Sequence, residues 1–101
     1  MIHKDLENWS KLNFASKMAN IGSEAARVLS WGSSRNGEDS LARFLQLLEL
    51  TINQEKSDAR KTELKILKKY FITSIEKNKL RSQQQVRNYF IDFALLARKF
   101  S

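Results

Sequence analysis

The sequence contains no proline and only three glycines, at positions 22, 32 and 37. A β-sandwich or β-barrel needs turn residues about every ten positions, so an all-β fold is excluded. Long stretches without either residue favour helices, whose interiors proline breaks and glycine weakens. Of the 101 residues, 42% are apolar, which is enough for one compact core. We therefore expect a single helical domain over residues 1–101.

Apolar residues recur at spacings of three and four through four segments, as in helices that bury one face. The first segment, residues 6–31, predicts a helix about 39 Å long at 1.5 Å per residue. Gly32 follows it, in the position where helices favour a left-handed residue. Short connections between the segments favour antiparallel neighbours. The pattern predicts an all-α, antiparallel up-down-up-down four-helix bundle with a long first helix.

Capping residues predict where the other three helices begin. Asp39 or Ser40 is expected to cap the second helix, and Ser57 or Asp58 the third. Residues 33–38 and 78–81 are expected to be loops, with Ser82 opening the fourth helix. The residues predicted to be largely buried are Leu12, Ile21, Leu45, Leu48, Leu67, Phe71, Phe90 and Phe93.

The net charge of +7 belongs entirely to the second half of the chain, which carries twelve Lys/Arg and five Asp/Glu. Such asymmetry indicates an acidic partner for this half, such as nucleic acid, an acidic protein face or an anionic membrane surface, and does not choose among them. The basic side chains with the spacing to line one side are Lys61, Lys65, Lys68, Lys69, Lys77, Lys79 and Arg81. They predict sequence-independent phosphate contacts, or else only a solvated face that keeps a small protein soluble.

Apolar residues exceed what one small bundle needs to bury. The first two helices are apolar over more than one face, and the fourth adds Tyr89, Phe90, Ile91, Phe93, Leu95 and Phe100 within a dozen residues. Self-association absorbs such a surplus most simply, and symmetric dimers are the commonest assembly. We expect a homo-oligomer, with a dimer favoured, or a protein partner.

Three polar residues, Asn20, Glu24 and Arg27, share one face of the first predicted helix. They form either a polar binding site or an ordinary solvated face with a local ion pair, and the second interpretation is favoured. Gly22, inside the same helix, costs about 1 kcal/mol relative to Ala, so we expect a close helix contact there. Trp9 and Trp31 are expected in the core or at its edge.

Catalytic residue types are scarce. His3 is the single histidine and there is no cysteine, so the usual pairs of nucleophile and base cannot form. Four carboxylates, Glu24, Glu49, Glu63 and Asp92, are the remaining candidates for a divalent metal, but a di-iron bundle needs a Glu followed three residues later by His. We expect no enzyme activity and no cofactor.

Two strings in the first two thirds of the chain carry a family resemblance. They are residues 19–24 (ANIGSE), followed by Arg27 and Trp31, and residues 47–52 (LLELTI). Over residues 9–71 the chain resembles a family of small uncharacterised bacterial all-helical proteins, which implies a helical fold and a bacterial source. In size, charge and helix count it is also similar to ribosomal-intervening-sequence proteins and related retroelement accessory proteins, basic four-helix bundles that assemble as rings.

The start of the chain mixes charges and has no apolar run of signal-peptide length, and no apolar stretch reaches 18 residues. We therefore expect a cytoplasmic protein without a membrane partner.

Overall fold

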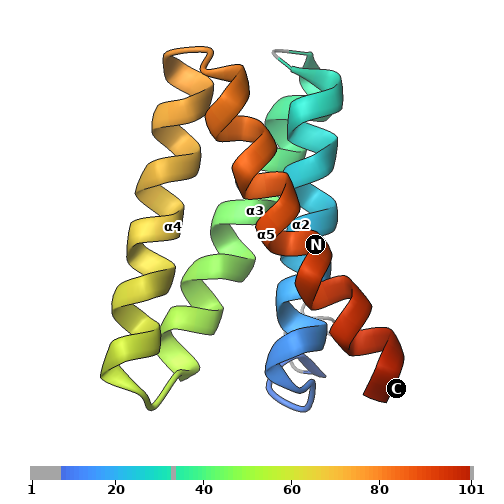
Figure 1. Cartoon of the computed structure of the whole chain (residues 1–101), viewed down its shortest axis with the longest axis vertical. Helices are drawn as coiled ribbons and strands as arrows, with labels where there is room; N and C mark the ends of the chain where they lie inside the picture. The colour runs from blue at the N-terminus through green and yellow to red at the C-terminus, as the bar shows by residue number, and fades with distance from the viewer. Residues whose placement is uncertain (1–7, 33, 101) are drawn as a thin grey trace.

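The computed structural model describes residues 8–32 and 34–100, the last four of these by their backbone alone. Over these ranges it contains the helices α2 (Phe14–Trp31), α3 (Arg35–Gln54), α4 (Asp58–Glu76) and α5 (Leu80–Phe100). Successive helices run in opposite directions (Figure 1). The first and last of these helices, α2 and α5, pack against each other, and this contact closes the bundle. The predicted all-α, antiparallel four-helix bundle is confirmed.

Three phenylalanines from three helices lie at the centre of the core. The Phe44 ring of α3 lies 4.6 Å from that of Phe71 on α4 and 6.2 Å from that of Phe90 on α5, between ring centroids. From α2, the side chains of Met18 and Ile21 contribute to this core, and both are fully buried. Five residues predicted to be in the core are buried, namely Ile21, Leu48, Leu67, Phe71 and Phe90. Leu45 and Phe93 are partly buried against the same core.

The prediction of one long first helix is wrong. Residues 8 and 9 are helical, but the chain turns at residues 10–13 and α2 begins only at Phe14. Asn13 caps α2, because its side-chain oxygen accepts a hydrogen bond from the backbone N–H of Ser16 at 2.8 Å. The turn moves Leu12 off the apolar stripe, so the predicted burial of this residue is also wrong.

The turn at residues 10–13 determines where the side chain of Trp9 lies. Its indole is buried and the Nε1–H donates to the Thr51 hydroxyl of α3 at 2.9 Å. Thr51 in turn donates to the Leu47 carbonyl oxygen at 2.8 Å, so both polar groups are satisfied inside the bundle. The turn therefore allows the segment before α2 to place an aromatic side chain in the core, as expected for Trp9. Trp31 is 45% exposed, more than a position in the core allows.

The second helix begins earlier than predicted. Ser34 caps α3, accepting from the Gly37 N–H at 3.2 Å, so residues 35–38 form the first helical turn instead of a loop. Gly32 ends α2 with a positive φ of 57°, in agreement with the expected glycine at the end of the helix. Ser57 caps α4 as predicted, through a bond from the Arg60 N–H at 3.3 Å.

The fourth helix also begins earlier, at Leu80 instead of Ser82. Asn78 follows the end of α4 with a left-handed φ of 49°. Its N–H donates to the Ile75 carbonyl at 3.2 Å, and the Lys79 N–H donates to the Ser74 carbonyl at 2.9 Å. This pair of bonds is a Schellman motif with asparagine in the usual glycine position, and it ends α4 so tightly that α5 begins within two residues.

Candidate functional site

Where α5 crosses α2, the two helices approach each other closely at Gly22. A Cβ atom placed on Gly22 would lie 2.6 Å from the Cβ of Phe90, a separation that real side chains do not adopt. Only glycine allows α5 to come this near, so the predicted close-packing role of Gly22 is confirmed. The neighbouring positions Ala19 and Ala26 are also small and remain partly exposed. They leave a hollow beside the crossing point.

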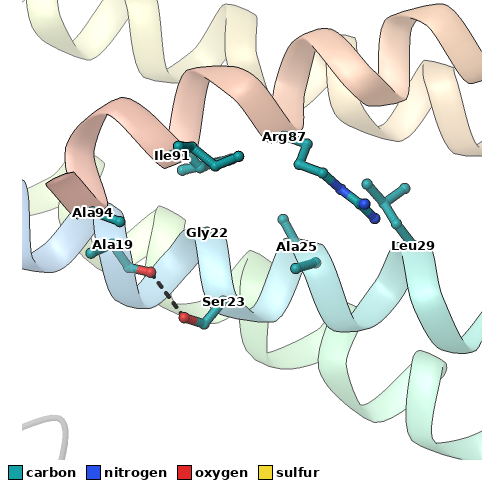
Figure 2. A pocket seen from close by; sticks show the side chains of 10 residues that line it. Ala19, Gly22, Ser23, Ala25, Leu29, Arg87, Ile91 and Ala94 are labelled. Atoms are coloured by element: carbon teal, nitrogen blue, oxygen red, sulfur yellow. Dashed lines mark hydrogen bonds between the residues drawn. The ribbon is translucent and has the colours of Figure 1, made fainter.

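This hollow is an apolar groove of about 170 Å³ between α2 and α5 (Figure 2). Small residues of α2 form one wall, and Ile91 and Ala94 of α5 belong to the other. The Ser23 hydroxyl donates to the Ala19 carbonyl at 3.2 Å, so this polar group is already paired within its own helix. Arg87 supplies a charged group at the groove. We name these residues of α2 and α5 the α2–α5 groove.

Exposed apolar side chains continue from this groove along α5. Ile91 is 47% exposed and Leu95, one turn further along, is 58% exposed. Residues four apart lie on the same helix face, so the two side chains form a short apolar ridge next to the groove. Phe93, in contrast, points inward and packs edge-on against Phe14 of α2 at 5.6 Å between ring centroids.

A second apolar hollow of about 230 Å³ lies between α4 and α5. Ile66, which is 63% exposed, and Tyr70 belong to its α4 side. Tyr89 on α5 donates its hydroxyl hydrogen to the Glu63 carboxylate at 2.6 Å. Burial of the Tyr89 ring, and then this hydrogen bond, raise the pKa of Tyr89 above its ordinary value. Polar bonds therefore hold α4 and α5 together beside this hollow.

Four of the predicted basic residues, Lys61, Lys65, Lys68 and Lys69, lie on α4, on the side toward α3. Lys68 reaches the Glu49 carboxylate of α3 at 3.3 Å. In the described part of the chain, Lys61, Lys65 and Lys69 have no carboxylate within ion-pair distance, and the last two are exposed. The remaining members, Lys77, Lys79 and Arg81, are exposed where α4 ends and α5 begins. The structure thus brings three unpaired lysines together on α4 and separates the turn residues from them.

The polar face of α2 differs from the favoured interpretation. Glu24 is buried, so the expectation of an ordinary solvated face is wrong for this residue. One carboxylate oxygen accepts from Arg27 at 2.8 Å and the other from Arg43 of α3 at 3.2 Å. Asn20 takes no part, because its amide donates to the Ser16 carbonyl at 3.0 Å. Arg43 is nineteen residues from Glu24, so spacing within one helix gives no signal for this contact.

The carboxylates that were candidates for a metal site are not gathered in the structure. Glu24 is bound to two arginines, Glu49 to Lys68 and Glu63 to Tyr89. Among the described residues no three His, Cys, Asp or Glu side chains lie close enough together to hold a metal ion. His3 lies outside the described residues.

Comparison of the chain with protein-family models, with curated proteins and with solved structures finds no match. The family resemblance stays a prediction. Within residues 8–32 and 34–100, no helix is long and apolar enough to cross a lipid bilayer.

Proposed function

We propose that this protein is a non-enzymatic helical bundle that acts by self-association, and that two copies meet at the α2–α5 groove. The observation that carries the proposal is the adjacency of a hollow and a ridge on one surface. Ala19 and Ala26 leave the hollow, while Ile91 and Leu95 protrude beside it. A symmetric dimer places the same surface of two copies in contact, so the ridge of each copy can face the hollow of the other.

The polarity of this surface supports a second copy as the occupant. A dimer contact excludes water from its centre, which favours apolar or internally paired groups there. The Ser23 hydroxyl is paired within α2, and Ile91 and Leu95 have no polar atoms beyond the helical backbone. In an antiparallel pair of α5 helices centred on Ile91, Arg87 of each copy would lie against Leu95 of the other. The aliphatic part of the arginine can cover the leucine while its charge stays in water.

Mass in solution tests the proposal. At tens of micromolar, light scattering should return twice the chain mass of 11.8 kDa for the wild type. Ile91→Glu and Leu95→Glu should each return a single chain, because a buried unpaired charge opposes the contact. Ile66→Glu is the matched control, since it places the same charge on an exposed isoleucine of the α4–α5 face, and should leave the dimer intact. A monomeric wild type contradicts the proposal, as does an Ile66→Glu variant that dissociates while Ile91→Glu does not.

A second candidate function is sequence-independent binding of nucleic acid through α4. The observation that favours it is the group of three lysines on one side of this helix, Lys61, Lys65 and Lys69, that lack carboxylate partners among the described residues. Since Lys68 is engaged by Glu49, three phosphate contacts are expected rather than four. The logarithm of the affinity should then fall against the logarithm of salt with a slope of about −2 to −3.

Electrophoretic mobility shifts at 50 mM salt with single- and double-stranded probes test this candidate. The pair of substitutions Lys65→Glu and Lys69→Glu should abolish the shift. The control pair Lys11→Glu and Lys56→Glu changes the net charge equally but leaves the α4 lysines in place, and should retain most of the binding. No shift at 100 µM wild-type protein rules the candidate out, and equal losses in both pairs would assign the binding to net charge alone.

A further inference from the structure

We propose that Arg27 and Arg43 form a clamp for the phosphate of a nucleotide, and that Trp31 beside them stacks on its base. The site lies on the seam between α2 and α3. It shares no residue with the α2–α5 groove or with the α4 lysines, so it stands independently of both proposals above.

The first argument is the charge of the cluster. One arginine is enough to neutralise the buried carboxylate of Glu24, yet two guanidinium groups are bound to it. The cluster therefore keeps one net positive charge, and two like charges are held close together by a single small anion. A second anion on the outer side would relieve their repulsion.

The second argument is the number of hydrogen-bond donors that the arginines retain. Each guanidinium has five N–H donors, and the bonds to Glu24 involve one Nη1 atom from each. The side chains of Arg27 and Arg43 are 48% and 43% exposed, so their other donors can reach the solvent. Planar guanidinium groups bind the oxygens of phosphate in pairs, and here a buried carboxylate fixes two of them in advance. This preorganisation distinguishes them from a surface arginine that is free to move.

The third argument is the exposed indole. Trp31 lies four residues after Arg27 on α2, and side chains at that spacing are neighbours on the helix surface, about 5–6 Å apart at Cβ. An aromatic ring beside a phosphate-binding group provides a platform on which a base can stack. The combination of phosphate clamp and aromatic platform fits a nucleotide better than it fits a sulfate or a carboxylate. A free mononucleotide and a nucleotide within a single strand offer the same chemistry.

One neighbouring group opposes binding and so gives an additional test. Asp39 lies one turn before Arg43 on α3 and is exposed. Its negative charge is on the same side of the helix as the clamp and should repel a phosphate. Asp39→Asn should therefore tighten binding by up to about fivefold, since exposed charge interactions of this kind are modest. A merely structural role of the two arginines predicts no change.

Tryptophan fluorescence of the full chain is the direct measurement, because Trp9 is buried and Trp31 is exposed. Adenosine monophosphate and a ten-nucleotide oligothymidylate should each quench the emission in a saturable way. Trp31→Phe should remove most of the quenching, because Trp31 is the exposed fluorophore. Trp31→Ala, measured by titration calorimetry, should weaken binding by at least about fivefold because the stacking surface is lost. Tighter binding of the oligonucleotide identifies a strand as the source, whereas equal or tighter binding of the mononucleotide identifies a small molecule. Inorganic phosphate should compete with both.

Arg43→Gln is the decisive variant. It removes one guanidinium while Arg27 still neutralises Glu24, so the helical circular dichroism should match that of the wild type. Loss of a charge-assisted contact should weaken binding about tenfold. Lys56→Gln, a matched loss of one positive charge at an exposed position outside both candidate binding surfaces, should change binding by less than about twofold.

The proposal is overturned if neither probe quenches Trp31 at millimolar concentration. It is also overturned if Arg43→Gln binds as tightly as the wild type, or if Lys56→Gln weakens binding as much as Arg43→Gln does. Ile91→Glu should leave the quenching unchanged, so failure of the dimer and failure of the clamp can be told apart.

Discussion

Gly22 is the residue on which the spacing of α2 and α5 depends. Its Cα faces the Cβ and ring of Phe90 directly, and a methyl group there would overlap atoms that lie next to the α5 backbone. Sequence reasoning identified the contact because glycine inside a helix is costly without a packing role. It could not identify Phe90 as the partner, since the partner depends on how the helices cross.

We expect Gly22→Ala to destabilise the fold, although alanine is the better helix former. Forcing α5 away should cost about 1–3 kcal/mol, against a gain of about 1 kcal/mol in helix propensity. The free energy of unfolding, measured with urea, should therefore fall by up to about 2 kcal/mol. Ala26→Gly removes a methyl group from the same face of α2 without creating a steric overlap. It therefore measures the effect of helix propensity alone. A Gly22→Ala variant more stable than the wild type would contradict the close contact.

Glu24 is the residue whose environment the sequence pattern predicted wrongly. Periodicity within α2 relates it to Arg27, three residues away, and an exposed pair of this kind contributes only a few tenths of a kcal/mol. The bond from Arg43 comes from another helix, and it allows the carboxylate to be buried. Contacts between helices depend on how the bundle packs, so the residue pattern within one helix cannot predict them.

Truncation of both arginines to alanine would leave the Glu24 carboxylate buried without a partner. We expect the free energy of unfolding to fall by about 3–5 kcal/mol in this double variant. Adding Glu24→Gln removes the charge and should restore most of the loss, which distinguishes an unpaired charge from lost side-chain packing. Thermal and urea denaturation measure both effects. Equal stability of the double and triple variants would contradict this explanation.

At the scale of elements, a helix boundary could be predicted only where a capping residue stands at a clear change in the apolar pattern. Ser57 precedes a clear apolar pattern and was recognised as a cap, whereas Asn13 interrupts a pattern that continues on both sides. The apolar periodicity of residues 6–31 therefore predicted one helix where the chain turns. Ser34 and Asn78 were missed for a similar reason, because serine and asparagine occur in loops as often as they cap helices.

The seam between α4 and α5 makes folding sensitive to high pH. The pKa of Tyr89 is raised by burial and by its bond to Glu63, while Arg60 acts in the opposite direction. The unfolded chain releases the Tyr89 proton near the ordinary tyrosine pKa of about 10, but the folded chain retains it. The contribution of Tyr89 to stability is thus fully present below about pH 10 and is lost as the pH rises further.

Urea denaturation at several pH values between 8 and 11 tests this linkage. Wild-type stability should decline more steeply above pH 10 than that of Tyr89→Phe, which has no proton to release. Below pH 9 the two proteins should differ by a constant amount, the contribution of the Tyr89–Glu63 hydrogen bond, about 1–3 kcal/mol. Parallel curves over the whole range would show that the raised pKa has no effect on folding.

At the scale of the whole molecule, composition correctly indicated more apolar surface than one bundle buries. Of the fourth-helix residues expected to exceed the core, Ile91 and Leu95 are exposed, whereas Phe90 is buried and Tyr89 and Phe93 are partly buried. The side chain of Phe100 lies outside the described part of the chain. Ile66 and Tyr70 on α4 are exposed as well, and the sequence pattern made no prediction for either residue. Residue counts predict how much apolar surface remains, but only the packed bundle shows on which faces it lies.

If the α2–α5 groove joins two copies, stability of the whole molecule must depend on protein concentration. Association of folded chains stabilises the folded state by mass action, so the Tm of the wild type should rise over a hundredfold range of concentration. Ile91→Glu should have a Tm that is independent of concentration and equal to or below the lowest wild-type value. Ile66→Glu, which leaves the groove unchanged, should keep the wild-type dependence. A wild-type Tm that stays constant across this range would show that the exposed ridge of α5 does not join two copies. The ridge would then be free to bind a different protein.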